Sequence, residues 1–320
     1  MTGQLIKAPF MASDLGAILP VFAEGKVREV YKIDENTLLF VASDRVSAYD
    51  VILANGVRNK GVILTLISAY WFKFLKAALP TLQSHFIGLD LPAQIPQELR
   101  RSYQNRSMVV RKVKVFPIES IVRGYIAGSA WREYQESSTV HGISMPSGLI
   151  ESCRLPKALW TPSTKADQGD HDINIHPRDA GKLIGQKYAD KIQSISVTLY
   201  NVAYAHAFSR GIIIADTKFE FGLDVETDQI ILIDEVLTPD SSRFWSASKY
   251  EAGRPQESFD KQFLRDWLTS NGLAEMENVE IPADIARKTE LKYYEAFERI
   301  TGNAFQDDMP SVPEGGNPAE

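Results

Sequence analysis

The segment 212–236 constrains the fold of this chain more than any other part of the sequence. Charged and apolar residues alternate in DTKFEFG, which begins at Asp216. Successive side chains of a strand point to opposite faces, so Asp216, Lys218 and Glu220 would share one face. We therefore predict a strand that carries a lysine between two carboxylates on one of its faces.

A second strand is predicted directly after the first. The turn-like stretch 225–229 leads into the apolar run 230–233, which is followed by Asp234. If the turn centres near Thr227, Glu220 and Asp234 lie opposite each other, although a one-residue change in loop length would shift that pairing. Mg²⁺ is commonly held by one or two carboxylates together with nucleotide phosphates. Glu220 and Asp234 are therefore candidate Mg²⁺ ligands, and the alternative is a solvated sheet face with ordinary ion pairs.

The first part of the sequence, residues 1–115, predicts a mixed α+β lobe. Two β-rich runs, 26–33 and 37–42, are separated by Asp-Glu-Asn and predict a hairpin. The apolar stretch 62–79 contains two lysines and predicts a buried helix instead of a membrane span. A third strand is predicted over 108–115, where valines and lysines alternate.

Residues 116–302 predict a second, larger lobe. The segment 137–177 is rich in Pro, Ser, Gly and Asp and predicts a long loop, which in a protein is usually functional or disordered. The other expected elements are a long helix over 178–209, helices near 259–270 and 283–300, and a mobile tail over 303–320.

The segment GKVREVY, which begins at Gly25, is a candidate phosphate-contacting loop. Glycine lets the chain approach a ligand closely, and neighbouring backbone N–H groups can hold phosphate oxygens. Lys26 and Arg28 lie on either side of Val27 and, on a strand, would share one face toward an anion. The segment is neither a P-loop nor a GxGxxG motif, so an exposed basic strand is the alternative.

Two arginine-containing segments are candidate anion sites. RGYIAGS runs from Arg123 to Ser129 and combines a guanidinium, which can bind phosphate bidentately, with a hydroxyl and nearby amides. The alternative there is a helix start capped by Ser129. Arg243 lies close in sequence to the proposed Mg²⁺ carboxylates and could bind a second phosphate. The alternative interpretation is an arginine that stacks on Trp245.

The segment KADQGDHD, residues 165–172, concentrates ionisable groups inside the predicted long loop. Lys165 and Asp172, at its two ends, are candidate substrate contacts. A flexible surface loop is the alternative interpretation.

Charge and composition narrow the classes of partner. The formal net charge of −6 argues against bulk attraction to nucleic acid or to an anionic membrane, so cations that bind phosphate must be gathered at a site. A single cysteine and the lack of a signal-peptide pattern favour a reducing compartment, the cytoplasm. We expect small-molecule substrates, no nucleic-acid or membrane partner, and a monomer or small homo-oligomer.

These segments occur together in an order that resembles the SAICAR synthetase (phosphoribosylaminoimidazole-succinocarboxamide synthase) family. The resemblance extends from about Gly25 to Trp267, and VRGYIAGS, DTKFEFG and DEVLTPDSSRFW are its most specific segments. It implies an α+β, two-lobed fold with an ATP cleft between an N-terminal antiparallel-sheet lobe and a larger C-terminal lobe. It also implies de novo purine biosynthesis, in which ATP, CAIR and L-aspartate give SAICAR, ADP and phosphate.

The resemblance also implies a role for each residue singled out above. Contacts to ATP phosphates are implied for Gly25, Lys26, Val27 and Arg28, and Mg²⁺ binding for Glu220 and Asp234. Binding of the CAIR ribose phosphate is implied for Arg123, Ser129 and Arg243, the reacting centre for Lys218 and Asp216, and substrate contact for Lys165 and Asp172. Asp44 and Asp50 belong to the matching segment ASDRVSAYD but receive no role.

The expected cofactors are ATP and Mg²⁺. Phosphorylation of a carboxylate by ATP makes an acyl phosphate, whose phosphate can leave when the amine of aspartate attacks. We expect no covalent protein intermediate, because no nucleophile stands out. One rival is a small-molecule kinase, which would need no amine substrate; another is a non-catalytic nucleotide-binding module, which would bind ATP without releasing ADP.

Overall fold

The computed structural model describes residues 8–49, 51–165, 172–259 and 261–306. The chain divides into two units. Unit 1 holds the described residues of Met1–Tyr70, Phe86–Lys112 and Asp260–Glu320, and unit 2 holds those of Trp71–His85 and Val113–Phe259. Helices accompany antiparallel sheets in both units, so the α+β class is confirmed.

Unit 1 contains a five-stranded sheet in the order β1-β2-β3-β7-β6. Its strands are β1 (Val21–Glu24), β2 (Arg28–Lys32), β3 (Thr37–Ala42), β7 (Ser107–Arg111) and β6 (Phe86–Gly88). β2 and β3 form the predicted hairpin, in which Tyr31 is paired with Leu39. Both side chains are buried in one core with Leu15 of η1 (Leu15–Ala17) and Tyr103 of α2 (Gln97–Tyr103).

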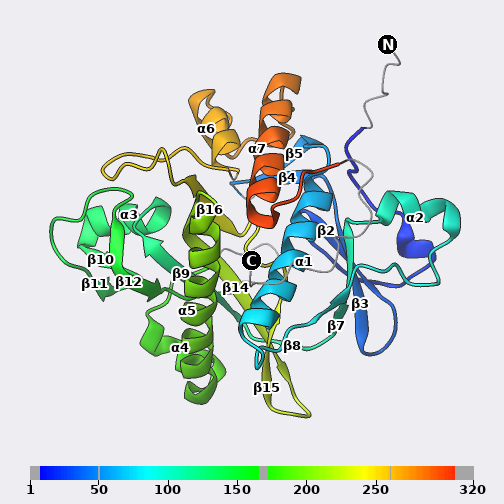
Figure 1. The fold of residues 1–320 in the computed structure, drawn as a ribbon, viewed down its shortest axis with the longest axis horizontal. Coiled ribbons are helices and arrows are strands. Elements are labelled where there is room, and N and C mark those ends of the chain that lie inside the picture. Colours follow the sequence, from blue (N-terminus) through cyan, green and yellow to red (C-terminus); the bar gives the residue numbers. More distant parts are fainter. Residues whose placement is uncertain (1–7, 50, 166–171, 260, 307–320) are drawn as a thin grey trace. The chain divides into compact units, whose positions relative to one another are not determined.

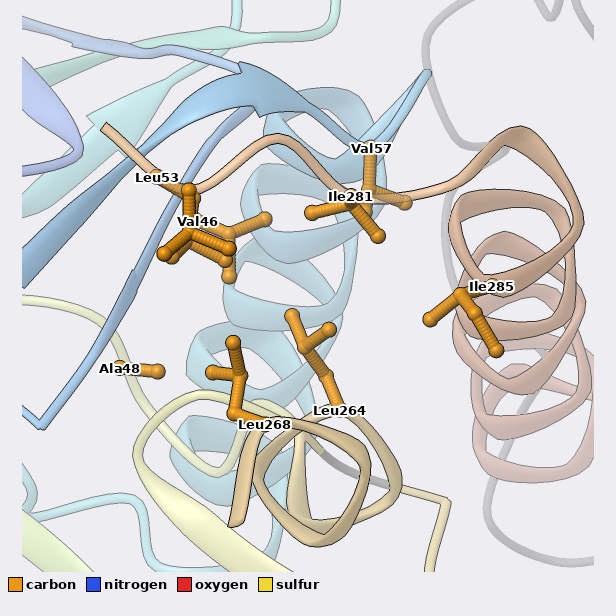
Figure 2. Packing of buried hydrophobic residues seen from close by; sticks show 9 residues of the cluster. Val46, Ala48, Leu53, Val57, Leu264, Leu268, Ile281 and Ile285 are labelled. Atoms are coloured by element: carbon orange, nitrogen blue, oxygen red, sulfur yellow. The ribbon is translucent and has the colours of Figure 1, made fainter. Parts of the chain in front are cut away.

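A second core of unit 1 joins segments that are far apart in the sequence. Its elements are β4 (Arg45–Ala48), β5 (Val51–Gly56), α6 (Gln262–Ser270) and α7 (Ala283–Thr301). Figure 2 shows Val46 and Leu53 of the strands clustered with Leu268 of α6 and Ile285 of α7. Amphipathic helices must bury their apolar faces, and the β4–β5 ribbon supplies the surface that these two helices cover.

This second core makes the units differ from the predicted lobes 1–115 and 116–302. The chain passes from unit 1 to unit 2 after Lys112, close to the predicted boundary, but α6 and α7 return to unit 1. Order along the sequence places these helices in the second lobe, whereas their apolar faces pack on β4 and β5. Residues 307–320 of the predicted tail lie outside the described residues.

Unit 2 is organised by one long strand, β14 (Ile212–Asp224). Its neighbours are β8 (Lys114–Val115), β9 (Ile118–Tyr125), β15 (Gln229–Ile233) and β16 (Ser242–Ser246), and β9 pairs in addition with β12 (Arg154–Trp160) and β13 (Ser163–Thr164). The strand predicted over 212–221 is confirmed as β14, whereas the strand predicted over 230–236 ends at Ile233 as β15.

Helices of unit 2 follow or cover this sheet. α5 (Gln186–Ser209) packs on β14, β9 and β12 and runs across the sheet in Figure 1. The other helices are α3 (Gly128–Ser137), directly after β9, and α4 (Pro177–Ile184). The predicted helix over 178–209 is wrong as one piece, because Gly185 has φ +86° and separates α4 from α5.

Two further predictions need correction. The strand predicted over 108–115 is two strands, β7 and β8, which belong to different units. The predicted loop over 137–177 contains β12, whose backbone pairs with β9, and the short strands β10 (Thr139–Val140) and β11 (Ile143–Ser144). This polar segment forms strands because it pairs with partners that are distant in the sequence, although its composition is typical of loops.

The apolar stretch 62–79 forms α1 (Lys60–Ala78), as predicted. By length and composition α1 could cross a membrane, but 61% of its most apolar window is buried inside the structure. Ile63, Leu66 and Trp71 are fully buried, which is the pattern of a core helix.

Candidate active site

A row of three charged side chains crosses the sheet of unit 2. In the strand register, Asp216 of β14 is paired with Arg123 of β9 on one side and with Arg243 of β16 on the other. Nη1 of Arg123 donates to Oδ2 of Asp216 at 3.1 Å, and Nη1 of Arg243 donates to the same oxygen. The strand pairing therefore brings together three residues that are widely separated in the sequence.

This row carries more positive than negative charge. Arg123 and Asp216 are buried, and Arg243 is partly buried. Burial lowers the pKa of Arg123; Asp216 opposes that effect, while Arg243 adds to it. Glu133 acts on Arg123 through space, and its own Oε1 accepts from Thr139 and Gly142. Since one carboxylate contacts two guanidiniums, the row is suited to an additional anion.

The beginning of α3 lies against this row. Gly128 has φ +57°, and a Cβ there would be 2.3 Å from Nη2 of Arg243, so glycine is needed for this close approach. Ala127 is the N-cap residue and no side chain caps the helix, so the alternative in which Ser129 is the cap is wrong. Ser129 instead lies in the first helical turn, where backbone N–H groups favour anions.

Lys218, two residues after Asp216, lies in an acidic environment. Its Nζ donates to Oε1 of Glu119 at 2.8 Å and to Oε1 of Glu220 at 2.7 Å. Burial alone would lower the pKa of Lys218, but Glu220, Glu119 and Asp234 outweigh burial and hold the pKa well above its ordinary value. Lys218 therefore keeps its positive charge. It lies on the strand that was predicted to carry a lysine between two carboxylates.

Glu119 is a residue of this cluster that the sequence reasoning missed. It lies on β9, and burial raises its pKa while Lys218 opposes that rise. A period of two from Arg123 back along IESIVR would have placed Glu119 on the same strand face. The pattern did not indicate that β9 pairs with β14, and this pairing is what brings Glu119 to Lys218.

The two candidates at the ends of KADQGDHD reach the same acidic cluster. Nζ of Lys165 contacts Oε2 of the buried Glu220, and the charge of Asp172 raises the pKa of Glu119. Residues 166–171 of this segment lie outside the described residues. Lys165, at the beginning of this segment, is exposed but contacts a buried carboxylate of the cluster.

Asp234 lies near the cluster, but its strand register differs from the predicted one. Glu220 is paired with Ile233, so the turn leaves Asp234 one position beyond the expected register. Asp234 follows the end of β15 and has φ +64°, an unusual backbone conformation for a residue other than glycine. Its carboxylate nevertheless acts on Lys218 by charge. The predicted direct opposition of Glu220 and Asp234 is wrong, but both belong to one electrostatic neighbourhood.

The acidic cluster has the chemical character of an Mg²⁺–phosphate site. Its carboxylates, from Glu119, Glu220, Asp234 and Asp172, accompany the ammonium groups of Lys218 and Lys165. Among the residues that the structure describes, no three His, Cys, Asp or Glu side chains form a ready metal cage. Mg²⁺ is usually held by one or two carboxylates and substrate phosphates, so such a cage is not required.

The candidate phosphate loop belongs to unit 1. N of Gly25 donates to O of Arg28 at 2.8 Å, which closes a tight connection between β1 and β2. Lys26 and Val27 form the turn itself, so the prediction of a strand starting at Lys26 is wrong by two residues. The guanidinium of Arg28 lies over the ring of Phe40, 5.2 Å from its centroid.

Asp44, which had no assigned role, forms a closed structural network in unit 1. Its carboxylate accepts from N of Phe10 at 2.8 Å, N of Gly61 at 2.9 Å and Nη1 of Arg106 at 3.0 Å. Gly61 lies in the first turn of α1, so Asp44 satisfies a helix N-terminus. Asp50 lies outside the described residues.

Known proteins resemble this chain over most of its length. The model of the SAICAR synthetase family matches residues 21–282. The phosphoribosylaminoimidazole-succinocarboxamide synthase of Candida maltosa is 52% identical over 298 residues, which cover 92% of this chain and 99% of the relative. That of Saccharomyces cerevisiae is 49% identical over 302 residues, covering 92% and 98%.

Solved structures show the same likeness. The SAICAR synthase from Saccharomyces cerevisiae complexed with SAICAR superposes with a TM-score of 0.84 and 46% identity, covering 92% of this chain and 99% of that one. A type-2 SAICAR synthetase in complex with ADP gives a TM-score of 0.66 and 27% identity, covering 89% and 99%. The resemblance in the motifs, the matched family model and the relatives that span almost the whole chain together show that this chain belongs to the SAICAR synthetase family.

Proposed function

We propose that this chain catalyses the ATP-dependent ligation of L-aspartate to the carboxylate of CAIR, which gives SAICAR, ADP and phosphate in purine biosynthesis. The observation that carries this proposal is the charge arrangement along β14. A positively charged row at Asp216 adjoins an acidic, lysine-containing cluster at Lys218 and Glu220. One strand would thus present a site for an anion beside a site for a cation and phosphates. The relatives named above support the substrates.

The arginine row would bind the ribose phosphate of CAIR. Arg123 and Arg243 already share the carboxylate of Asp216, which holds both guanidiniums in place and leaves a surplus positive charge. The first turn of α3, with Ser129, would add backbone and hydroxyl donors. Planar guanidiniums are suited to phosphate because they can donate two parallel hydrogen bonds.

The acidic cluster would hold Mg²⁺ and position the reacting groups. Glu220 and Asp234 would be the Mg²⁺ ligands, and the bound ion would neutralise charge on the ATP phosphates. Lys218 would offset the charge that develops on the transferring phosphoryl group, because its high pKa keeps it protonated. Lys165 and Asp172 would contact substrate from the segment between β13 and α4.

The reaction would proceed by transfer of the γ-phosphoryl group to an oxygen of the CAIR carboxylate. The bond to ADP breaks as the acyl phosphate forms. The amine of aspartate then attacks the acyl carbon, phosphate leaves, and the nitrogen loses a proton. The protein contributes mainly positioning and charge stabilisation to such a phosphoryl transfer.

Gly25, Lys26, Val27 and Arg28 of unit 1 would contact the ATP phosphates. A relative's structure contains ADP, which supports a nucleotide as ligand of the family. We further propose a cytoplasmic enzyme, monomeric or a small homo-oligomer, whose partners are these small molecules and neither nucleic acid nor membrane.

The test is ADP release by the purified protein with Mg-ATP, with CAIR and aspartate omitted in turn. Release that needs both substrates, with formation of SAICAR, is the expected result. Release at a similar rate with CAIR alone would favour a small-molecule kinase. No release with any combination would leave a nucleotide-binding module and would overturn the proposed function.

A further inference from the structure

We propose that Arg45, assisted by Ser43, is the positioning residue that shapes the loop 25–28 into a phosphate-binding surface. The inference deepens the proposed function, since it rests on nucleotide phosphates binding at this loop. Both residues belong to ASDRVSAYD, the segment whose matching residues otherwise have no role in the reaction. All contacts that carry the inference lie within unit 1.

The guanidinium of Arg45 is bonded to the backbone of the loop. Its Nε donates to O of Lys26 at 2.8 Å, and its Nη2 donates to O of Gly25 at 3.1 Å. Its Nη1 donates to Oε1 of Glu29 at 2.5 Å and to O of Met11 at 3.0 Å. One planar group therefore holds two successive loop carbonyls and is itself held by a carboxylate.

Ser43 holds the next carbonyl of the loop. Its backbone N donates to O of Val27 at 3.0 Å, and its Oγ donates to the same oxygen at 2.9 Å. Three successive carbonyls, those of residues 25, 26 and 27, are thus drawn toward the segment that contains Ser43 and Arg45.

This arrangement decides where the loop amides point. The described peptide bonds include no cis bond, and in a trans peptide the C=O and the N–H of the following residue point in opposite directions. The N–H groups of Lys26 and Val27 are consequently directed away from Arg45, and that of Arg28 is directed away from Ser43. Successive N–H groups on one side of a turn form a concave anion-binding surface, to which the two basic side chains add charge.

A guanidinium is required for this role because of its shape. Arg45 uses three different nitrogens toward separated acceptors, which the single ammonium of a lysine cannot reproduce. Glu29 is buried, and burial raises its pKa while Arg45 opposes that rise. Its Oε2 has no hydrogen-bond partner among the described residues, so Arg45 is the group that compensates this carboxylate.

The decisive variant is Arg45→Lys in the full chain, which retains a positive charge for Glu29 but loses the bonds to the loop carbonyls. We expect the dissociation constant for ADP to rise about tenfold to hundredfold, since hydrogen bonds involving charged groups are lost from the support of the loop. Binding of adenosine, which has no phosphate, is expected to change less than about threefold. The KM for ATP should rise with the ADP constant, while KM for CAIR stays near the wild-type value.

Arg58→Lys is the matched control, because Arg58 is also a partly buried arginine of unit 1 that pairs with a buried glutamate, Glu290. It is expected to leave ADP binding unchanged. A second variant, Glu29→Gln, retains an acceptor for Arg45 and should weaken ADP binding less than Arg45→Lys. Thermal unfolding of each variant verifies that the protein is folded at the temperature of the binding measurement.

Unchanged ADP binding in Arg45→Lys would overturn the inference, and so would equal losses of ADP and adenosine binding. Failure of the wild-type protein to bind ADP would overturn it as well. The proposed function fails separately: a wild-type protein that binds ADP but makes no SAICAR would contradict the reaction, while the effect of Arg45→Lys on ADP binding would still stand.

Discussion

Two buried aspartates, each bonded to arginine, differ in the balance of charge around them. In unit 1, Asp44 meets one arginine, Arg106, and its remaining acceptor positions are taken by backbone N–H groups. In unit 2, Asp216 is shared by Arg123 and Arg243. The first carboxylate is paired with one guanidinium, while the second is shared by two guanidiniums.

The difference distinguishes a carboxylate held largely by backbone donors from one that links two guanidiniums. A buried carboxylate that is fully paired needs no further partner, and removing one member of such a pair is costly because the other charge stays buried. A carboxylate that holds two guanidiniums positions them for another anion. Burial and ion pairing alone therefore do not distinguish these two aspartates, whereas the number of guanidiniums that each one holds does.

The largest expected effect concerns the closed network. Asp44→Ala would leave Arg106 without its carboxylate and remove the acceptor of Gly61 N at the start of α1, so we expect a loss of about 3–5 kcal/mol in the free energy of unfolding. Urea denaturation measures it. Glu35→Ala, which removes the exposed pair of Lys32 and Glu35, is the control and should leave stability nearly unchanged. Equal effects of the two variants would show that the Asp44 network contributes no more to stability than an exposed ion pair.

The next effect is catalytic. Lys218→Met removes the positive charge between Glu119 and Glu220, and we expect the barrier to rise by about 2.7–4 kcal/mol, which is roughly 10²–10³ in turnover. Steady-state turnover at saturating substrates measures it. Lys187→Met, at an exposed ion pair with Asp228, should retain turnover. Near-normal turnover in Lys218→Met would show that its role is misassigned.

A smaller effect is expected at the surplus arginine. Arg243→Gln leaves Asp216 paired with Arg123, so stability should change little, but a charged hydrogen-bond donor to phosphate is lost. We expect KM for CAIR to rise about tenfold to hundredfold. The exposed variant Arg254→Gln serves as control. If CAIR and its dephosphorylated nucleoside lose affinity equally, Arg243 does not bind the phosphate.

The smallest effect is a dependence of stability on alkaline pH. The folded-state pKa of Lys218 is raised above its ordinary value of 10.5, because the surrounding carboxylates outweigh burial. A raised lysine pKa adds stability that is fully present below the unfolded-state pKa and is lost as pH rises through the folded-state pKa. We expect this loss to be present in the wild-type protein and absent in Lys218→Met. Urea denaturation from about pH 8 to about pH 11 compares the two proteins, and parallel curves would contradict the prediction.

Local periodicity predicted the central strand of the site well. Asp216, Lys218 and Glu220 lie on β14 because strand alternation depends only on neighbouring residues. The same reasoning failed for Asp234, since the register of a hairpin depends on the geometry of its turn, and Glu220 is paired with Ile233. Strand alternation alone would place Glu119 on the same face of β9 as Arg123. Its hydrogen bond with Lys218, however, depends on the pairing of β9 with β14.

The sequence by itself determined the chemical inventory of this protein, its main strands and helices, and the order of its motifs, because these follow from short-range periodicity and residue type. Only the tertiary structure decided which charges meet. Long-range strand pairing makes Asp216 a bridge between two arginines, burial of apolar faces returns α6 and α7 to unit 1, and Arg45 orients a loop that precedes it in sequence. Such contacts depend on how distant segments share buried surface and satisfy backbone groups, which a local pattern does not contain.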